Sequence, residues 1–261
     1  MTALIRSYKA EDDKEVRFIM AKGAMEGLAP ANMQSIFHPL SLALWGLLSS
    51  IWIQYMGWWP SLDEDVYQLA LALISLMLPL GTTAVPNILF SDWINRPYFD
   101  DQTQAALHAP DMASNLETYY SRSRASGIWI LELGGRTIGL IAIDASPDAE
   151  VARLEDVPKG TKRKASHTAV IRHFYVDEQY RPTGIQKDLL DHALKTTFSA
   201  DSSLARVKAT SSPLREYTAK ALTEAGFKFE AVAATIGLLR WKVNTLVLTK
   251  GALQNSVKSR K

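Results

Sequence analysis

The spacing of apolar residues changes its period near residue 184. Residues 169–176 are rich in β-branched and aromatic side chains, which predicts a strand. The polar residues 177–183 contain Pro182 and end that strand. From Gly184 onward the apolar positions follow helical spacing, at Ile185, Leu189, Leu190, Ala193 and Leu194. The pattern therefore predicts a strand, a short turn and a helix in succession.

A turn of this kind favours anion binding at the start of the helix. The first N–H groups of a helix have no partner within it, and the helix dipole makes that end positive. Gly184 would let the backbone approach a ligand closely, and Arg181 adds a positive charge. Both a phosphate site and an ordinary corner without a ligand are consistent with these residues.

The remaining pattern predicts a domain of mixed helices and strands. Residues 4–8 are a strand candidate, and the acidic residues 11–13 after them are well placed to open a helix. Gly134 and Gly135 predict a β-hairpin, because both turn positions tolerate a positive φ. Further elements are predicted towards the carboxyl end, with strands over 205–210, 229–236 and 241–248 and a helix over 213–225. The last two strands are apolar enough that contact with a membrane surface is an alternative.

Two long uncharged stretches interrupt this domain. Residues 36–59 would span about 36 Å as a helix, more than the roughly 30 Å of a bilayer's hydrocarbon core. Residues 66–90 also lack charges, although Pro79, Gly81 and Pro86 interrupt them and leave a kinked span or a re-entrant half-span open. We predict two membrane segments, with a buried core helix as the alternative for the first.

The distribution of positive charge orients this hairpin. Lys14, Arg17 and Lys22 precede the first segment and Arg96 follows the second, while the connecting turn carries no positive charge. The positive-inside rule therefore predicts that both ends face the cytosol. The basic residues 159–164 are expected to be a solvated loop or a contact with anionic headgroups.

Composition excludes some classes of function. A net charge of +2 over 261 residues gives no support for a nucleic-acid partner. Cysteine is absent, which excludes disulfides and thiolate metal sites. The histidines show no metal-ligand spacing, so no metal is expected.

Residues 176–194, V-x-x-x-Y-R-x-x-G-I-x-x-x-L-L-x-x-A-L, resemble the acetyl-CoA pyrophosphate loop of the GNAT N-acetyltransferase superfamily. Its core pattern is Gln/Arg-x-x-Gly-x-Gly/Ala, which Arg181 and Gly184 match and Gln186 does not. The resemblance implies a GNAT-like α+β fold, with a mixed, mostly antiparallel sheet flanked by helices. Here a transmembrane helical hairpin would interrupt that fold.

The interruption resembles one subgroup of that superfamily. A hydrophobic hairpin after the first helix, followed by D-M-x-x-x-L-x-x-Y-Y at residues 111–120, is similar to the camello-type membrane-anchored N-acetyltransferases. These include cysteine-S-conjugate and aspartate N-acetyltransferases. We expect an integral membrane protein with a cytosolic catalytic domain, located in the endoplasmic reticulum membrane. The expected division is a first strand and helix, a hairpin, the rest of the domain and a basic tail, at 1–30, 31–91, 92–250 and 251–261.

The resemblance also assigns binding roles. The strand before the loop would bond the pantetheine arm of acetyl-CoA through its backbone, at Phe174, Tyr175 and Val176. The loop and helix start would hold the pyrophosphate, at Arg181, Thr183, Gly184, Ile185 and Gln186.

Proton transfer has two candidate residues. His173 is the imidazole on this strand and a candidate general base, because a base with a pKa near neutrality is favoured. A histidine that faces solvent or a neighbouring side chain is the alternative. Many members have a general-acid tyrosine four residues before a Gly-Phe pair, where this chain has Leu222. Tyr217 lies on the same predicted helix, roughly 140° away, and is a weak substitute.

The expected function is acetyl transfer from acetyl-CoA to a primary amine of a small or amphipathic acceptor. A catalytically impaired, membrane-anchored binding module with the same fold is the alternative, because Gln186 and Leu222 depart from the family pattern. A third hypothesis is transfer of a longer acyl chain to a lipid amine.

Overall fold

The computed structural model describes residues 3–60, 65–150 and 167–253. The chain forms two compact units. The first comprises residues 1–26, 100–236 and 240–261, and the second comprises residues 27–99 and 237–239. The basic stretch at 159–164 and most of the predicted tail lie outside the described residues.

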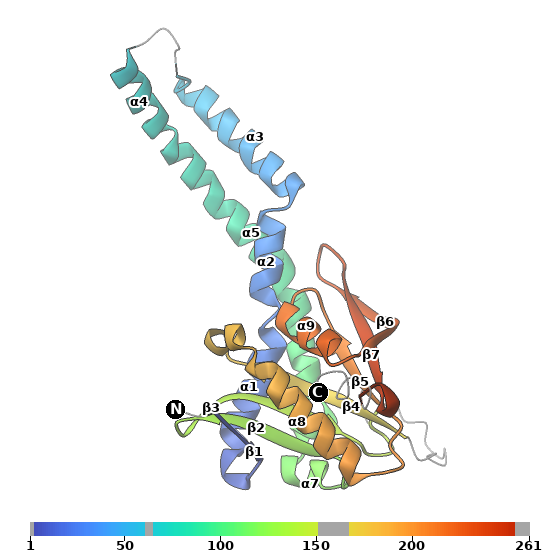
Figure 1. The fold of residues 1–261 in the computed structure, drawn as a ribbon. Helices are drawn as coiled ribbons and strands as arrows, with labels where there is room; N and C mark the ends of the chain where they lie inside the picture. The colour runs from blue at the N-terminus through green and yellow to red at the C-terminus, as the bar shows by residue number, and fades with distance from the viewer. Residues whose placement is uncertain (1–2, 61–64, 151–166, 254–261) are drawn as a thin grey trace. The chain divides into compact units, whose positions relative to one another are not determined.

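The first unit contains a seven-stranded sheet with the order β1-β2-β3-β4-β5-β7-β6 (Figure 1). All neighbouring strands are antiparallel except β4 and β5, which are parallel. This confirms the predicted mixed, mostly antiparallel sheet. The strands are β1 Ala3–Ser7, β2 Gly127–Leu133, β3 Arg136–Asp144, β4 Thr168–Val176, β5 Arg206–Ser211, β6 Lys228–Ile236 and β7 Trp241–Thr249.

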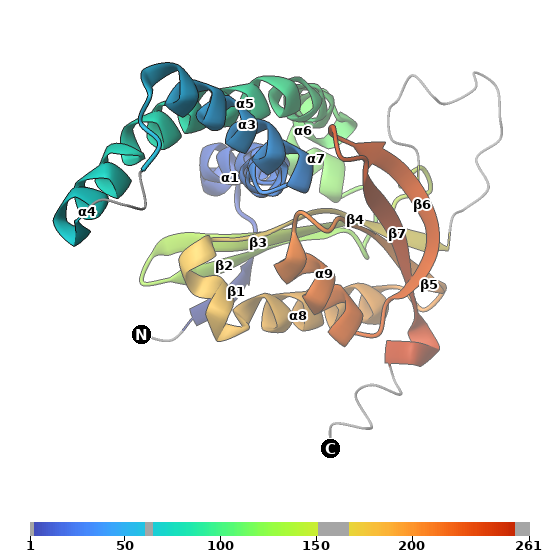
Figure 2. The ribbon, with the colours of Figure 1, turned by 90° about the horizontal axis from the view of Figure 1, so that it is seen from above.

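Helices cover both faces of this sheet (Figure 2). One face packs against three helices, α1 Asp13–Met25, α6 Pro110–Ala113 and α7 Leu116–Tyr120. The short 3₁₀ turn η1 Ala10–Asp12 precedes α1. The other face packs against α8 Ile185–Ala200 and α9 Glu216–Glu224. The 3₁₀ segment η3 Glu178–Thr183 joins β4 to α8. The sheet therefore has a separate apolar core on each side.

Some boundaries differ from the predicted ones. The helix predicted over 213–225 begins at Glu216, after Arg215 takes a non-helical conformation. Residues 229–236 and 241–248 lie in β6 and β7, which pair with each other, and β7 also pairs with β5. The Gly134-Gly135 hairpin is confirmed, with φ values of 60° and 80°.

β4 and β5 pair over only part of their lengths. Their parallel ladder covers Thr168–Val170 against Arg206–Lys208. On its other edge β4 stays paired with β3 as far as Val176, with a β-bulge at Arg172. The two parallel strands therefore separate beyond residue 170, and one edge of β4 faces away from any strand of the described sheet.

The second unit contains α2 Leu28–Ile36, α3 Pro39–Met56, α4 Val66–Ser75 and most of α5 Met77–Leu107. The apolar stretch 36–59 is not one helix, because His38 is extended and α3 restarts at Pro39. The second stretch is divided between α4 and α5 at Leu76. α5 continues through Pro86, near which a kinked span or a re-entrant half-span was expected. A proline removes one helical hydrogen bond and bends a helix without having to end it.

One helical segment of the described residues, Val66–Leu107, is long and apolar enough to cross a membrane. Residues 10–36 and 39–56 add a second only if this pair, bent by 56°, counts as one span. The hairpin with two crossings therefore stays a prediction.

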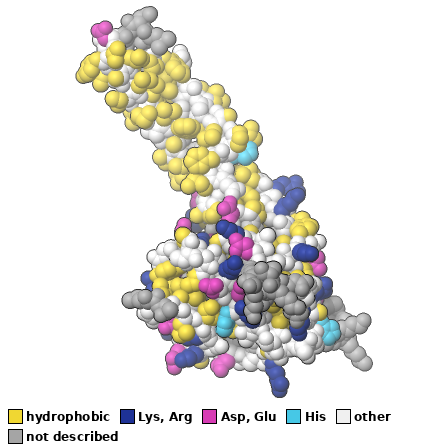
Figure 3. All heavy atoms as spheres, in the orientation of Figure 1, with side chains coloured by type: hydrophobic (Ala, Val, Ile, Leu, Met, Phe, Trp, Pro, Cys, Tyr) yellow, Lys and Arg dark blue, Asp and Glu magenta, His cyan; other side chains and the backbone are white. Residues whose placement is uncertain are grey.

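Polar residues lie between α3 and α5, and apolar residues lie outside them. The Ser49 and Thr83 hydroxyls are 2.7 Å apart, and the Ser41 hydroxyl donates to Asn87 Oδ1 at 2.8 Å. Large apolar side chains are exposed along the same helices, including Leu40 at 75% and Tyr55 at 84%. Figure 3 shows these apolar side chains gathered over the hairpin. This pattern is the reverse of that in a water-soluble helix pair.

Gly139 lies at a position on β3 where the neighbouring strand β4 leaves no room for a side chain. A Cβ at this position would lie 2.8 Å from the carbonyl oxygen of Tyr175 and 3.0 Å from a methyl carbon of Val176. We predict that Gly139→Ala lowers the free energy of unfolding by about 1–3 kcal/mol, because the backbone must shift. Gly251→Ala, with open space around its Cβ, is the control for denaturant unfolding. Equal stability of the two variants would contradict this account of Gly139.

Candidate functional site

The separation of β4 from β5 opens a small cavity between them. Its volume is about 40 Å³, which is room for about one water molecule. Its walls include Ile171 and Phe174 of β4, together with Arg215, Thr218 and Leu222 from α9 and the residue before it. A larger cavity of about 290 Å³ lies among β2, α7 and α8 and shares no lining residue with the first.

A helix start lies directly after the free edge of β4. Gly184 separates η3 from α8 and has a φ of +76°, a conformation that glycine adopts without strain. A Cβ at Gly184 would meet no atom within 4 Å, so the backbone is open on that side. The N–H groups of Ile185 and Gln186 lie in the first turn of α8, where no helical carbonyl precedes them, whereas that of Lys187 donates to the carbonyl oxygen of Gly184 at 3.0 Å. Open backbone, N–H donors and the helix dipole together fit a diphosphate.

The side chain of Gln186 is partly buried at this corner. Its Oε1 atom is buried and has no hydrogen-bond partner among the described residues. A buried acceptor without a donor costs about 1–3 kcal/mol. Because Oε1 is buried, a ligand at this corner cannot reach it without a movement of the side chain. The predicted contact of Gln186 with a pyrophosphate thus stays a prediction.

Arg181 is bound by protein groups. Its Nε donates to the carbonyl oxygen of Val176 at 2.8 Å, and its guanidinium forms an ion pair with Glu26. The same guanidinium lies 3.9 Å above the ring of Tyr217. The predicted contact of Arg181 with a pyrophosphate thus stays a prediction. Thr183 donates to the carbonyl oxygen of Tyr180 at 2.6 Å, within the loop.

The hydroxyl of Tyr217 donates to Glu26 Oε2 at 3.0 Å, and its ring packs 6.4 Å from that of Phe174. Burial raises the pKa of Tyr217, and the nearby Glu26 charge adds to this. A role for Tyr217 as general acid stays a prediction. Leu222, where many relatives have a tyrosine, is buried in the cavity wall and offers no proton.

His173 is held by a buried carboxylate. Its Nε2 lies 2.8 Å from Asp111 Oδ2, and the Tyr120 hydroxyl donates to the same oxygen at 2.9 Å. Burial raises the pKa of Asp111, but the hydrogen bond and charge of His173 outweigh it and bring the pKa to about 2. An ionised carboxylate only accepts hydrogen bonds, so Nε2 carries a proton whether the ring is charged or neutral. In the neutral ring Nδ1 is therefore the acceptor.

The histidine was predicted from the sequence and its partner was not. Asp111 lies 62 residues before His173, on the short helix α6, and no local pattern links the two. The signal in the sequence was the run from Asp111 to Tyr120, whose aspartate and last tyrosine both belong to this cluster. His173 therefore lies beside a neighbouring side chain, which was one of the two alternatives. This contact uses Nε2 and does not exclude a role for Nδ1 as a base.

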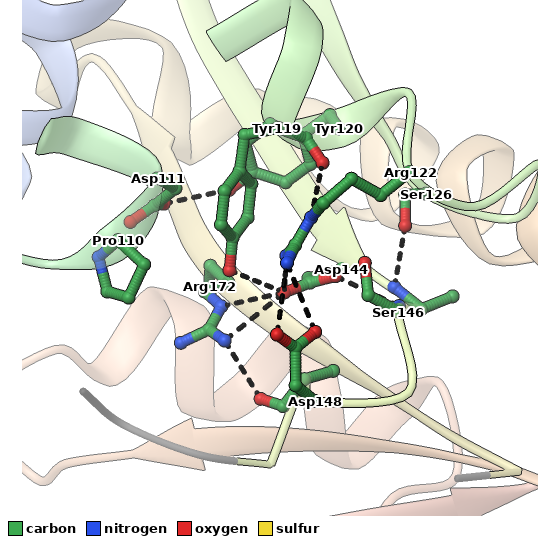
Figure 4. A network of polar contacts seen from close by, with 12 residues as sticks. Pro110, Asp111, Tyr119, Tyr120, Arg122, Ser126, Asp144, Ser146, Asp148 and Arg172 are labelled. Carbon is green, nitrogen blue, oxygen red and sulfur yellow. Dashed lines mark hydrogen bonds and ion pairs between the residues drawn. The ribbon is translucent and has the colours of Figure 1, made fainter. Parts of the chain in front are cut away.

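A second buried carboxylate stabilises the same region (Figure 4). Asp144 at the end of β3 accepts from the Tyr119 hydroxyl at 2.8 Å and from Arg172 Nη2 at 3.1 Å. Arg122, which follows α7, forms an ion pair with Asp148 at 3.1 Å. These contacts tie α7 to β3 and β4 and so fix the bulge at Arg172, directly before His173. No group of acidic and histidine residues able to hold a metal ion occurs in the described part of the chain.

Comparison with known proteins gives one family match. The model of the acetyltransferase (GNAT) family matches residues 89–227. No curated protein matches the chain in sequence. Similar solved structures include a GNAT-family acetyltransferase from Streptococcus pneumoniae, with 12% identity, a TM-score of 0.47 and coverage of 95% of this chain and 99% of that one. Another is spermidine N-acetyltransferase from Vibrio cholerae in complex with CoA and spermine, with 10% identity and a TM-score of 0.48. The match covers 97% of this chain and 98% of that one.

The pKa of Asp111 makes stability depend on pH. Its folded pKa of about 2 lies below the ordinary value of 3.8, so its charged form contributes stability that is complete above about pH 4. That contribution is lost as the pH falls from about 4 to about 2. We predict that Asp111→Asn removes this part of the acid dependence of unfolding and lowers stability at pH 7.

The measurement is denaturant unfolding between pH 2 and pH 7. Glu117→Gln is the control, because Glu117 is exposed on the neighbouring helix α7 and should leave the acid dependence unchanged. An Asp111→Asn protein with the wild-type pH profile would show that His173 does not depend on this carboxylate.

Proposed function

Because this chain belongs to the acetyltransferase (GNAT) family, we propose that it is a membrane-anchored N-acetyltransferase. It moves an acetyl group from acetyl-CoA to a primary amine of a small or amphipathic acceptor. The observation that supports this most is the free edge of β4, which is followed, after η3, by the open helix start at Gly184.

The residues that we propose bind acetyl-CoA lie along the free edge of β4 and at the start of α8. Backbone groups of Phe174, Tyr175 and Val176 would bond the pantetheine arm, because this edge of β4 has no strand beside it in the described sheet. The first N–H groups of α8 would hold the diphosphate, with Gly184 allowing close approach. The narrow cavity beside β4 means that side chains must move to admit the arm.

Acetyl transfer requires a neutral amine and a route for its protons. His173 Nδ1 takes the proton as the amine nitrogen bonds to the thioester carbonyl carbon, and the carbon–sulfur bond then breaks. Asp111 keeps the imidazole in the tautomer that has Nδ1 free and stabilises it once it is charged. The thiolate takes its proton from water, since Leu222 replaces the family tyrosine.

The reversed polarity of the helical hairpin supports membrane anchoring. In water an exposed row of Leu, Ile and Trp side chains is unfavourable, whereas in lipid the polar groups are the ones that must be buried. Asn95 is fully buried and donates to Ser35 at 2.9 Å, so the inner side of the helices is polar as lipid requires. The positive-inside rule then favours a cytosolic catalytic domain, and we propose the endoplasmic reticulum membrane as its location.

Anchoring also suggests the class of acceptor. The hairpin is inserted between Glu26 and Asp100. Glu26 contacts Arg181, and Asp100 precedes Asp111, the partner of His173, on the next short helix. An amphipathic amine is concentrated at the membrane surface and meets an anchored enzyme more often than a soluble amine does.

The central test is acetylation of an amine panel by the full chain purified in detergent. We predict acetyl-CoA-dependent transfer, and that His173→Gln lowers kcat about 10²–10⁴-fold, the usual loss for a general base. His192→Gln is the control, because His192 is exposed on α8, which packs on the opposite face of the sheet from Asp111 and its helix.

The outcomes separate the two candidate functions. Binding of acetyl-CoA without turnover of any amine would favour the catalytically impaired binding module. Equal rates for His173→Gln and His192→Gln would exclude His173 as the base. A preference for palmitoyl-CoA over acetyl-CoA would indicate transfer of longer acyl chains.

A matched pair of leucines tests the anchor. Leu47 at the centre of α3 and Leu4 on β1 are both 58% exposed. We predict that Leu47→Arg releases much of the protein on alkaline carbonate extraction, because an arginine at a helix centre costs about 2.5–3.5 kcal/mol of insertion. Leu4→Arg should stay in the membrane pellet. A wild-type chain that is fully extracted by carbonate would contradict membrane anchoring.

A further inference from the structure

Glu26 is a buried carboxylate with two partners in the first unit. It caps the end of α1, and its side chain is 11% exposed. Arg181 forms an ion pair with one oxygen, and the Tyr217 hydroxyl donates to the other at 3.0 Å. Burying a carboxylate is unfavourable unless such partners compensate it. The cluster therefore connects α1, the η3 loop and α9 through one side chain.

This cluster lies at the position where a ligand would enter. Arg181 is three residues before Gly184, and its Nε uses the carbonyl oxygen of Val176, an acceptor at the end of β4. Tyr217 packs against Phe174, which lines the cavity between β4 and β5. The carbonyl group and the space that the proposed arm of coenzyme A requires are thus taken by the chain's own side chains.

Two cations act on this carboxylate, one by direct contact and one through its charge. Arg181 binds Glu26 directly, and the charge of Arg215, which lines the cavity, also acts on it. A carboxylate paired with a guanidinium group resembles a phosphate oxygen in the same place, because both are anionic acceptors for its N–H donors. A diphosphate carries more negative charge than one carboxylate and is the stronger partner for Arg181.

We propose that Glu26 is an internal competitor for Arg181 and sets the affinity of the site for its anionic co-substrate. This rests on the proposed function, because the ligand is the diphosphate of coenzyme A. When the diphosphate binds, Arg181 leaves Glu26 and the Val176 carbonyl, and Tyr217 loses the contact that holds it over the cavity. The arm of the co-substrate then takes the released acceptor on β4.

The test is the dissociation constant of CoA, measured by titration calorimetry on the detergent-purified full chain. Glu26→Gln keeps the shape of the side chain and removes its charge. We expect it to bind CoA roughly tenfold more tightly than wild type, the size of one charge-assisted hydrogen bond. Affinity equal to or weaker than wild type overturns the proposal.

Two further variants separate competition for Arg181 from a general effect of charge. Glu216→Gln removes the same charge from the exposed first turn of α9, so it reports general electrostatic attraction and should change affinity less than twofold. Equal tightening by Glu216→Gln and Glu26→Gln overturns the proposal. Tyr217→Phe removes the hydroxyl that holds Glu26 and should tighten CoA binding by a smaller factor, which provides the test if Glu26→Gln does not fold.

Failure of this proposal is distinguishable from failure of the proposed function. Tighter binding by Glu26→Gln supports the competitor role even if no amine is acetylated. Acetylation by the wild type with no gain in CoA affinity in the variant rejects the competitor role and leaves the enzyme assignment standing. Absence of CoA binding by wild type and variant alike rejects both.

Discussion

The site depends on the short parallel ladder between β4 and β5. Only three residue pairs join these strands, while antiparallel partners hold β4 on its other edge and β5 on its far side. Because both outer edges are fixed, the strands can separate without unfolding the sheet. The separation leaves backbone groups of β4 without a strand partner in the described sheet, which a sheet normally does not permit. The backbone groups proposed to hold acetyl-CoA lie along that edge or at the turn that follows it.

Local features of the fold were predictable from the sequence. The Gly134-Gly135 turn and the change of period at Gly184 placed a hairpin, a strand and a helix correctly, because each depends on neighbouring residues. Helix breaks were harder to predict. The break at His38 has a local cause, because Pro39 disfavours the helical conformation of the residue before it, but the apolar run around it favoured one continuous helix. Pro86 lies inside α5 and does not end it.

Contacts between distant residues were not predictable. His173 was found because it is the histidine on a predicted strand, but Asp111 reaches it from an element 62 residues away. Arg181 was expected to face a phosphate, and its binding to Glu26 depends on where α1 ends in three dimensions. A single sequence carries no record of such pairs. The sequence therefore predicted which helix, strand or loop carries a residue better than it predicted the partner of that residue.

The pairing of β1 with β2 has a consequence for synthesis of the chain. Arg6 on β1 and Glu132 on β2 form an ion pair across 126 residues of sequence, and the helical hairpin lies between them. At about 5–20 residues per second, β1 leaves the ribosome roughly 6–25 s before its partner strand. During that interval an unpaired edge is exposed to other chains. Its short length, five residues with an arginine near its end, limits the aggregation that a longer apolar strand would risk during translation.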